Sequence, residues 1–273
     1  MPVLSIVSGA YNLENCFSFK NSIESILSQS FTDFEFIICD DGSVDRTYEI
    51  LSEYAERDNR IILLRNEKNL GLAQTLNNCI SVAKGEFIGR HDLDDYSAAD
   101  RFEKQLTYLY EHPEVGLLGT AAYLFDGDGI FDTVRFPKTV TTTDFLFNSP
   151  YQHGSVVFRR EVLEKAGGYT VSKATRRTED YELFMRIQLF ARGENLTELL
   201  YHFLEDDRAL KRRKYRYRID EMKVRFSGFR ALRLLPKGIL YVIKPLIVGL
   251  IPTFILKKLR KQRRKKQTEK TNY

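Results

Sequence analysis

The sequence predicts an α/β fold with a mostly parallel central sheet and helices on both faces of that sheet. Short apolar segments that are typical of buried strands alternate with segments whose apolar residues recur every three or four positions. This alternation indicates a parallel sheet covered by helices. The chain has 273 residues, 43% of them hydrophobic, which is enough to bury a full core. We therefore expect one large α/β domain followed by a shorter extension.

The first 90 residues contain four expected strands with helices between them. In chain order these elements are a strand at 3–8, a helix with an apolar stripe of Phe19, Ile23, Ile26 and Leu27, a strand at 34–39, a helix at 45–57, a strand at 60–65, a helix with Leu72, Leu76, Cys79 and Ile80, and a strand at 86–89. Polar motifs follow three of the strands, at 9–12, 40–45 and 90–95. Because ligands of such sheets bind beyond the carboxyl ends of the strands, these motifs predict a site there.

The second half of the chain mixes short strands and helices and is expected to extend the same sheet. Its elements are a helix at 101–111, a hairpin of strands 117–125 and 130–136 around Asp126-Gly127-Asp128-Gly129, a strand at 154–158, a short helix ending at Gly167-Gly168, a helix at 179–191 and a strand at 196–204. No internal repeat is visible.

Charge is distributed unevenly along the chain. Residues 257–273 contain nine Lys or Arg and one Glu, or +8, so the net charge of +5 leaves about −3 (5 − 8) for the rest. The preceding residues 239–256 are almost wholly apolar, although Pro245 and Pro252 argue against a straight spanning helix. We predict that 219–256 lies on an anionic membrane or enters it as a re-entrant segment, and we expect no binding of nucleic acid. The alternative is an apolar hairpin packed on the body, with a disordered tail.

These patterns divide the chain into three parts. They are an α/β domain at 1–205, a basic and apolar helical extension at 206–256 and a basic, disordered tail at 257–273. The three cysteines are scattered, without the spacing of metal ligands, and are expected as reduced core residues. Because a strand follows Met1-Pro2 directly, no signal peptide is expected. We therefore expect a protein on the cytoplasmic side of a membrane.

Three carboxylates within four residues, Asp92, Asp94 and Asp95, follow the fourth strand. Side chains alternate along an extended chain, so Asp92 and Asp94 are expected on one side, about 6–7 Å apart. Two carboxylates at a strand end suit a hard divalent cation that also takes phosphate oxygens, which is how a nucleotide diphosphate is usually held. The alternative is a solvated acidic turn.

Other polar residues have both a functional and a structural interpretation. Asp40 and Asp41 could accept hydrogen bonds from a base or a ribose, or could form an Asx turn that caps a helix. Arg90 could contact a phosphate or pair with the carboxylates on the surface. His153 could meet a phosphate or an acceptor, or could be a structural histidine. Arg208 and the basic run 211–214 could close over a diphosphate, or could face solvent or lipid.

Asp180 is the candidate general base. It lies in Thr178-Glu179-Asp180, which opens an amphipathic helix, and the alternative is ordinary helix capping. Transfer of a sugar requires a carboxylate to take the proton of the attacking hydroxyl. A helix N-terminus lowers the pKa of a carboxyl group, so burial or a neighbouring acid such as Glu179 must offset that effect.

Taken together, the motifs resemble those of family 2 glycosyltransferases, which have the GT-A nucleotide-sugar fold. The resemblance covers roughly residues 3–204 and is greatest to bacterial transferases for capsule, exopolysaccharide or lipopolysaccharide. Its elements are Ser5-Ile6-Val7, Tyr11-Asn12, residues 25–35, Asp40-Asp41-Gly42-Ser43, Asn69-x-Gly71-Leu72, Ala83-Lys84-Gly85, Arg90-x-Asp92-x-Asp94-Asp95, Arg101-x-x-Lys104-Gln105, His112-Pro113, Gly167-Gly168-Tyr169 and Glu179-Asp180-Tyr181-Glu182-Leu183.

The resemblance implies a role for each candidate. The donor nucleotide, expected to be that of a UDP-sugar, would contact Ala10, Asn12, Asp40, Asp41, Asn69, Arg90 and Asp92. Asp94, together with Asp92, would hold Mn²⁺ or Mg²⁺ on the diphosphate. Asp180 would be the base of a single inverting displacement, with His153 and Glu179 near the acceptor or a phosphate. The acceptor would be lipid-linked or a growing glycan, which places the enzyme on the cytoplasmic face of the bacterial inner membrane.

The sequence departs from the family pattern at two places. Ser8-Gly9-Ala10 stands where the family often has a proline, and no clear aromatic–arginine element is visible around Tyr201-His202-Phe203. Two other classes of protein compete with this interpretation. A sugar-nucleotide nucleotidyltransferase should have a basic, glycine-rich N-terminal loop, and residues 8–12 contain no basic residue. A non-catalytic membrane-bound assembly protein would not need intact Asp92, Asp94 and Asp180.

Overall fold

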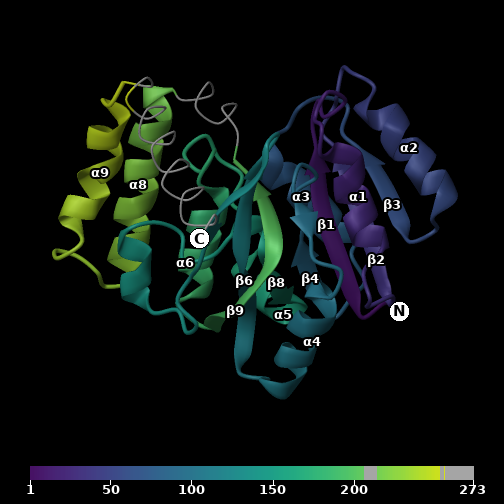
Figure 1. Cartoon of the computed structure of the whole chain (residues 1–273). Coiled ribbons are helices and arrows are strands. Elements are labelled where there is room, and N and C mark those ends of the chain that lie inside the picture. Colours follow the sequence, from purple (N-terminus) through teal and green to yellow (C-terminus); the bar gives the residue numbers. More distant parts are fainter. Residues whose placement is uncertain (206–213, 253–254, 256–273) are drawn as a thin grey trace, which may run out of the picture.

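The protein is built around one nine-stranded sheet in the order β3-β2-β1-β4-β8-β6-β9-β5, with β7 paired to β6 (Figure 1). A computed structural model of the chain describes residues 1–205, 214–252 and 255. The strands are β1 (Leu4–Ala10), β2 (Phe34–Asp40), β3 (Ile61–Arg65), β4 (Phe87–Arg90), β5 (Tyr96–Ser97), β6 (Val115–Asp126), β7 (Gly129–Val134), β8 (Val157–Arg159) and β9 (Arg192–Leu204). The helices are α1 (Phe19–Leu27), α2 (Thr47–Arg57), α3 (Leu72–Val82), α4 (Arg101–Glu111), α5 (Arg160–Ala166), α6 (Glu179–Ile187), α8 (Tyr215–Ala231) and α9 (Ile239–Gly249), with the 3₁₀ turns η1 (Thr142–Leu146) and η2 (His153–Ser155).

The first four long strands form the predicted parallel half of the sheet. β1 pairs in parallel with β2 and β4, and β2 pairs in parallel with β3. The register places Ala10 beside Asp40 and Val7 beside Arg90. The carboxyl ends of these strands therefore share one edge, and the motifs at 9–12, 40–45 and 90–95 meet there as predicted.

The second half of the sheet is mixed, so the prediction of a mostly parallel sheet holds only for the first half. β8 is antiparallel to β4 and β6, β7 is antiparallel to β6, and β5 is antiparallel to β9, whereas β6 and β9 are parallel. The predicted hairpin around Asp126-Gly127-Asp128-Gly129 is confirmed as β6 and β7. Its tight turn is available to antiparallel strands but not to parallel ones.

Two predicted boundaries near the end of the domain were wrong. The helix α6 ends at Ile187 rather than 191, and β9 begins at Arg192 rather than 196. The start of β9 was hidden because its residues Gly193, Glu194 and Asn195 are not apolar, yet all three are buried. Asn195 Nδ2 donates there to the carbonyl oxygens of Pro137 (2.9 Å) and Pro150 (3.1 Å), whereas its Oδ1 has no hydrogen-bond partner among the described residues.

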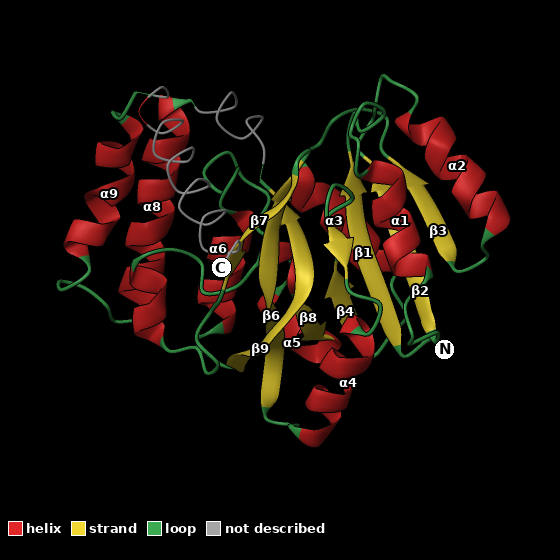
Figure 2. Ribbon diagram, viewed as in Figure 1, coloured by secondary structure: helices red, strands yellow, loops and turns green. Residues whose placement is uncertain are grey.

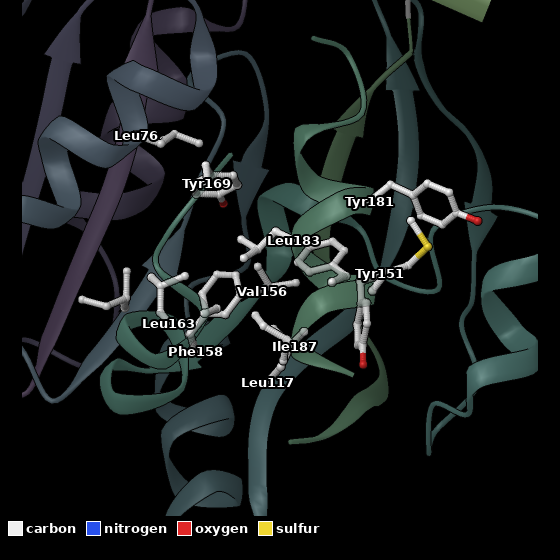
Figure 3. Packing of buried hydrophobic residues seen from close by; sticks show 14 of the residues in the cluster. Leu76, Leu117, Tyr151, Val156, Phe158, Leu163, Tyr169, Tyr181, Leu183 and Ile187 are labelled. Carbon is white, nitrogen blue, oxygen red and sulfur yellow. The ribbon is translucent and has the colours of Figure 1, made fainter. Parts of the chain in front are cut away.

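Helices cover both faces of the sheet, as predicted (Figure 2). Strand β2 shows the division, because Phe36 and Ile38 belong to the core cluster under α1, α2 and α4. Ile37 and Cys39 belong to the cluster on the other face, with side chains of α3, α5 and α6. Figure 3 shows part of this second cluster, in which residues of β6, β8, α3, α5 and α6 gather. The three cysteines are free and buried, as expected.

The C-terminal extension is a pair of helices that packs on the body of the protein. Figure 1 shows α8 beside α6, and α9 on the outer side of α8. Phe229 of α8 is fully buried and Val242 of α9 is 4% exposed, and both belong to the core cluster around α6. No helix among the described residues is both long and apolar enough to cross a membrane. The packed hairpin was the alternative interpretation of this segment, and its contact with a membrane stays a prediction.

We expect Phe229→Ala to lower the free energy of unfolding by about 3–5 kcal/mol, because it leaves a cavity between α8 and the core. Phe226, on the same helix, is 46% exposed and provides the matched control. Phe226→Ala should change stability by less than about 1 kcal/mol. Urea unfolding of both variants measures the difference. Equal stability of the two variants would show that α8 is not part of the cooperative core.

Candidate active site

The loop before α3 is held to the end of β2 by Asp41. Its Oδ1 accepts from the backbone N–H of Leu70 (2.8 Å), and its Oδ2 accepts from that of Gly71 (2.9 Å). A third bond reaches Oδ1 from Asn66 Nδ2 (2.9 Å). Both oxygens are thus occupied in a side chain that is 4% exposed. Asp41 therefore positions this loop, and its predicted contact with a nucleotide stays a prediction.

Asp40 is better suited to meet a ligand. Its side chain is fully buried, with Oδ2 accepting from the N–H of Ser43 (3.1 Å) and lying 3.3 Å from Arg65 Nε. Its Oδ1 has no hydrogen-bond partner within the described residues. Because an unsatisfied buried acceptor is costly, an N–H or O–H of a bound nucleoside would stabilise this atom.

The remaining predicted base-binding residues lie at the same edge of the sheet. Asn12 has a left-handed backbone (φ 53°), and its Oδ1 accepts from the N–H of Val44 (3.0 Å), which ties the loop after β1 to the loop after β2. Asn69 is exposed in the loop that packs on Gly42, where a Cβ atom would come within 3.0 Å of Asn69 N. Ala10 is buried, and its carbonyl accepts from the N–H of Asp41 (2.8 Å).

The acidic motif after β4 has the predicted alternation. His91, Leu93 and Asp95 are buried, whereas Asp92 and Asp94 are partly exposed. The backbone of the motif is anchored from α1, because Ser18 Oγ donates to Asp94 O (2.6 Å) and Ser22 Oγ donates to Asp92 O (3.2 Å). Asp95 accepts from the N–H at the end of β9 (2.7 Å). The outward carboxyl groups of Asp92 and Asp94 are therefore held on a rigid support.

Arg90 supports the motif from within the protein. Its side chain is fully buried, and its Nη2 pairs with Asp92 Oδ1 at 2.5 Å. The guanidinium also donates to the carbonyl oxygens of Val7 and His91. The predicted surface ion pair is thus a buried one. Arg90 therefore positions Asp92, and its predicted contact with the donor stays a prediction.

His153 lies beside the same pair and does not carry a positive charge. Its Nε2 is 2.8 Å from the hydroxyl of Tyr169. Burial, with a further contribution from the nearby Arg90 charge, lowers the pKa of His153 to about 3. The histidine is therefore neutral at pH 7, so its predicted contact with a phosphate or an acceptor would be a hydrogen bond rather than an ion pair. A neutral imidazole remains able to exchange hydrogen bonds with an acceptor.

Asp180 has the acid–base property that the sequence required. Burial raises its pKa to about 7, and the neighbouring charges of Glu179 and Asp92 act in the same direction. Backbone N–H groups at the start of α6 oppose this shift without cancelling it. Burial also raises the pKa of Glu179. The influence of Asp92 on Asp180 places the candidate base and the acidic motif in one electrostatic environment.

The C-terminal hairpin stabilises the start of α6. Tyr181, the residue after Asp180, donates its hydroxyl to the carbonyl of Phe145. The guanidinium of Arg225 in α8 lies over the Tyr181 ring, 5.0 Å from its centroid. The same guanidinium donates to the carbonyl oxygens of Leu146 (3.0 Å) and Phe147 (3.1 Å). Helix α8 therefore helps to position the segment that carries the candidate base.

Sequence reasoning missed two residues at this site. Tyr201 of β9 is fully buried, and its hydroxyl accepts from the N–H of Asp92 (3.1 Å). Gly154 packs so closely on this hydroxyl that a Cβ atom would clash with it. Gly154 lies in η2 and Asp92 in the loop after β4, so this contact joins two segments that are distant in the sequence. No local pattern signals such a contact, although a glycine beside a candidate histidine was a hint of close approach.

Asp92 and Asp94 could bind a divalent cation only together with oxygen ligands from the nucleotide. Asp92 and Asp94 offer hard carboxylate oxygens, which suit Mn²⁺ or Mg²⁺. Within the described residues, no group of three or more His, Cys, Asp or Glu side chains could hold a metal ion. Because Asp92 Oδ1 is paired with Arg90, Asp94 is the more suitable direct ligand. Arg208 and residues 211–213, proposed above to close over a diphosphate, lie outside the described residues.

Comparison with known proteins agrees with this geometry. The family model described as "Glycosyl transferase family 2" matches residues 5–167. The chain is 37% identical over 270 residues to a putative glycosyltransferase, EpsE, of Bacillus subtilis, covering 98% of this chain and 96% of that protein. It is 27% identical over 208 residues to WfaP of Escherichia coli, named as a UDP-Glc:alpha-D-GlcNAc-diphosphoundecaprenol beta-1,3-glucosyltransferase, covering 74% and 77% of the two chains.

Solved structures show the same GT-A fold. Staphylococcus aureus TarS (residues 1–349), in complex with UDP-GlcNAc, has a TM-score of 0.68 at 19% identity, covering 90% of this chain and 71% of TarS. A mannosyltransferase of Pyrobaculum calidifontis, in complex with GDP-Man and Mn²⁺, has a TM-score of 0.61 at 18% identity, covering 96% and 80%. The predicted resemblance is thus confirmed, and the two competing classes of protein lose their support. The family match, the fold and the arrangement of the acidic residues together show that this chain is a glycosyltransferase of family 2.

Proposed function

We propose that this enzyme transfers a sugar from a nucleotide diphosphate donor, a UDP-sugar, to a glycan or lipid-linked acceptor, with inversion at the anomeric carbon. The observation that carries the proposal is the family match over residues 5–167, and burial supports it by raising the pKa of Asp180 to about 7. A carboxyl group with a pKa near the working pH is well suited to take a proton during the reaction. We include in this proposal the predicted role in the synthesis of capsule or exopolysaccharide.

The protein's own residues account for the proton transfer. Asp180 takes the proton of the acceptor hydroxyl as that oxygen attacks the anomeric carbon. The bond from this carbon to the diphosphate oxygen breaks on the opposite face, and the nucleoside diphosphate leaves with the electron pair. A single displacement of this kind inverts the configuration. Neutral His153, bonded to Tyr169, is placed to orient the acceptor rather than to neutralise charge.

Asp94, with the second oxygen of Asp92, would hold Mn²⁺ or Mg²⁺ together with the diphosphate. When bound, such a cation stabilises the charge of the departing diphosphate as a Lewis acid. Asp40 Oδ1 would accept from the base or the ribose, while Asp41 and Arg90 keep the surrounding loops in place. The names of the relatives support a UDP-sugar and a diphospholipid acceptor, because WfaP is named for both.

Thermal unfolding with a panel of nucleotide diphosphates tests the donor and the metal together. A ligand that binds the native state stabilises it, by about 2.7 kcal/mol when its concentration is a hundred times Kd, and so raises the melting temperature. We expect a shift with UDP in Mn²⁺ that chelator abolishes. A shift with GDP or dTDP instead would keep the enzyme class and change the donor. The absence of any shift would contradict the proposed site.

A further inference from the structure

Helix α9 presents an apolar face to solvent that nothing in the described chain covers. Its most exposed side chains are Leu240 (75%), Leu250 (72%) and Ile247 (62%), with Ile239 (42%) and Ile243 (41%) beside them. These five residues, the α9 ridge, recur at helical spacing and form one stripe. Val242 and Pro245 of the same helix are buried toward the body. The helix is thus apolar on both sides.

The α9 ridge contains no charged side chain. The only charged residue of α9, Lys244, turns away and donates from Nζ to the carbonyl of Phe147 (2.8 Å). Tyr215 (46%) and Phe226 (46%) of the neighbouring α8 add exposed aromatic rings. An apolar patch of this extent on a protein in water marks a surface that binds something.

Positive charge lies on both sides of the ridge in the sequence. Arg230, Arg233 and Lys237 precede α9 and are exposed. Residues 257–273 follow it in the sequence and carry +8, from nine Lys or Arg and one Glu. An apolar helix face between basic segments is the arrangement of helices that lie in the headgroup layer of an anionic bilayer.

We propose that the α9 ridge inserts into the surface of an anionic lipid bilayer, while the basic residues around it bind the lipid headgroups. A second copy of the chain is the less suitable occupant. Facing ridges would bring the basic segments of two molecules together, and like charges repel. The proposal concerns the α9 surface alone, so it stands or falls independently of the donor and the reaction proposed above.

Co-sedimentation of the full chain with vesicles tests the proposal. The wild type should bind vesicles of phosphatidylglycerol and phosphatidylcholine, bind pure phosphatidylcholine more weakly, and lose affinity as NaCl is raised. The triple variant Leu240→Gln/Ile247→Gln/Leu250→Gln should have a partition coefficient lower by about tenfold or more. The matched control replaces three exposed apolar residues elsewhere, as Val82→Gln/Ile130→Gln/Leu189→Gln, and should bind as the wild type does.

Two further measurements distinguish between the possible explanations of a change in vesicle binding. Urea unfolding, compared with that of the wild type, checks that the triple variant is folded, whichever nucleotide the enzyme binds. Sedimentation velocity shows whether the wild type associates with itself. Undiminished vesicle binding by the triple variant, or no vesicle binding by the wild type, would overturn the proposal. A wild-type dimer that the triple variant dissociates, without vesicle binding, would assign the ridge to self-association instead.

Discussion

Asp180→Asn is expected to lower kcat by about 10²–10⁴-fold, because an amide cannot take the proton of the acceptor hydroxyl. The substitution keeps the size of the side chain, so the donor should still bind. The UDP-dependent thermal shift in Mn²⁺ should therefore be retained. Initial rates with saturating donor and acceptor measure the loss, and a variant that turns over like the wild type would remove Asp180 as the base.

The pH dependence of kcat provides a second test of Asp180. Since the base must be ionised, the wild-type kcat should fall as the pH drops below about 7, the pKa of Asp180. A carboxyl group whose pKa is raised on folding stabilises the fold below its unfolded pKa, and this contribution is lost as the pH rises through the folded pKa. Asp180→Asn should therefore have a higher melting temperature than the wild type at pH 8. A lower one would indicate structural damage.

Glu182→Gln is the matched control for Asp180→Asn. Glu182 lies in the same first turn of α6, where it pairs with Arg186 at 2.8 Å. Its substitution removes a negative charge from the helix N-terminus without touching the candidate base. We expect kcat to change by less than about threefold, because this partly buried helical ion pair does not include the candidate base. Equal losses in both variants would attribute the effect to the helix rather than to the base.

Asp94→Ala is expected to abolish the Mn²⁺-dependent part of UDP binding and to lower kcat/KM by about 10²–10³-fold. Asp94 is the carboxylate best placed to bind the cation, since Asp92 is paired with Arg90. Isothermal titration of UDP with and without Mn²⁺ measures the coupling between them directly. The affinity for UDP should become nearly independent of Mn²⁺.

The control for Asp94→Ala is Asp128→Ala, an exposed aspartate in the turn between β6 and β7. It should leave both the affinity and its dependence on Mn²⁺ unchanged. An Asp94→Ala enzyme that still binds UDP more tightly with Mn²⁺ would place the cation on other residues. The buried Asp95 would not be a better choice for the first test, because its carboxylate holds the end of β9 (2.7 Å).

The sequence predicted those parts of the fold that local periodicity controls. The alternation in 3–90 identified β1 to β4, and parallel pairing then brought the motifs after these strands to one edge. Asp92 and Asp94 are both partly exposed, as expected, although residues 92–95 form a turn rather than the extended chain on which that expectation was based. A role as general base required burial or a neighbouring acid to raise the pKa of Asp180. The structure has both, because Asp180 is buried beside Glu179.

Features that depend on contacts across the sheet could not be predicted in this way. The positioning roles of Asp41 and Arg90 could not be predicted, because their partners lie in other segments, the loop before α3 and the backbone of β1. The start of β9 was hidden because its buried residues are polar. The neutrality of His153 depends on burial beside Arg90, which no spacing in the sequence reveals.

The pairing of Arg90 with Asp92 bears on how the donor enters the site. This cation is already neutralised and His153 carries no charge, so neither can balance the charge of a diphosphate. The carboxyl groups of Asp94 and Asp180 oppose that charge further. Under the proposed function, a divalent cation that accompanies the nucleotide would balance this charge. Metal and donor then promote each other's binding by the same factor, so the supply of divalent cation would regulate the apparent donor affinity.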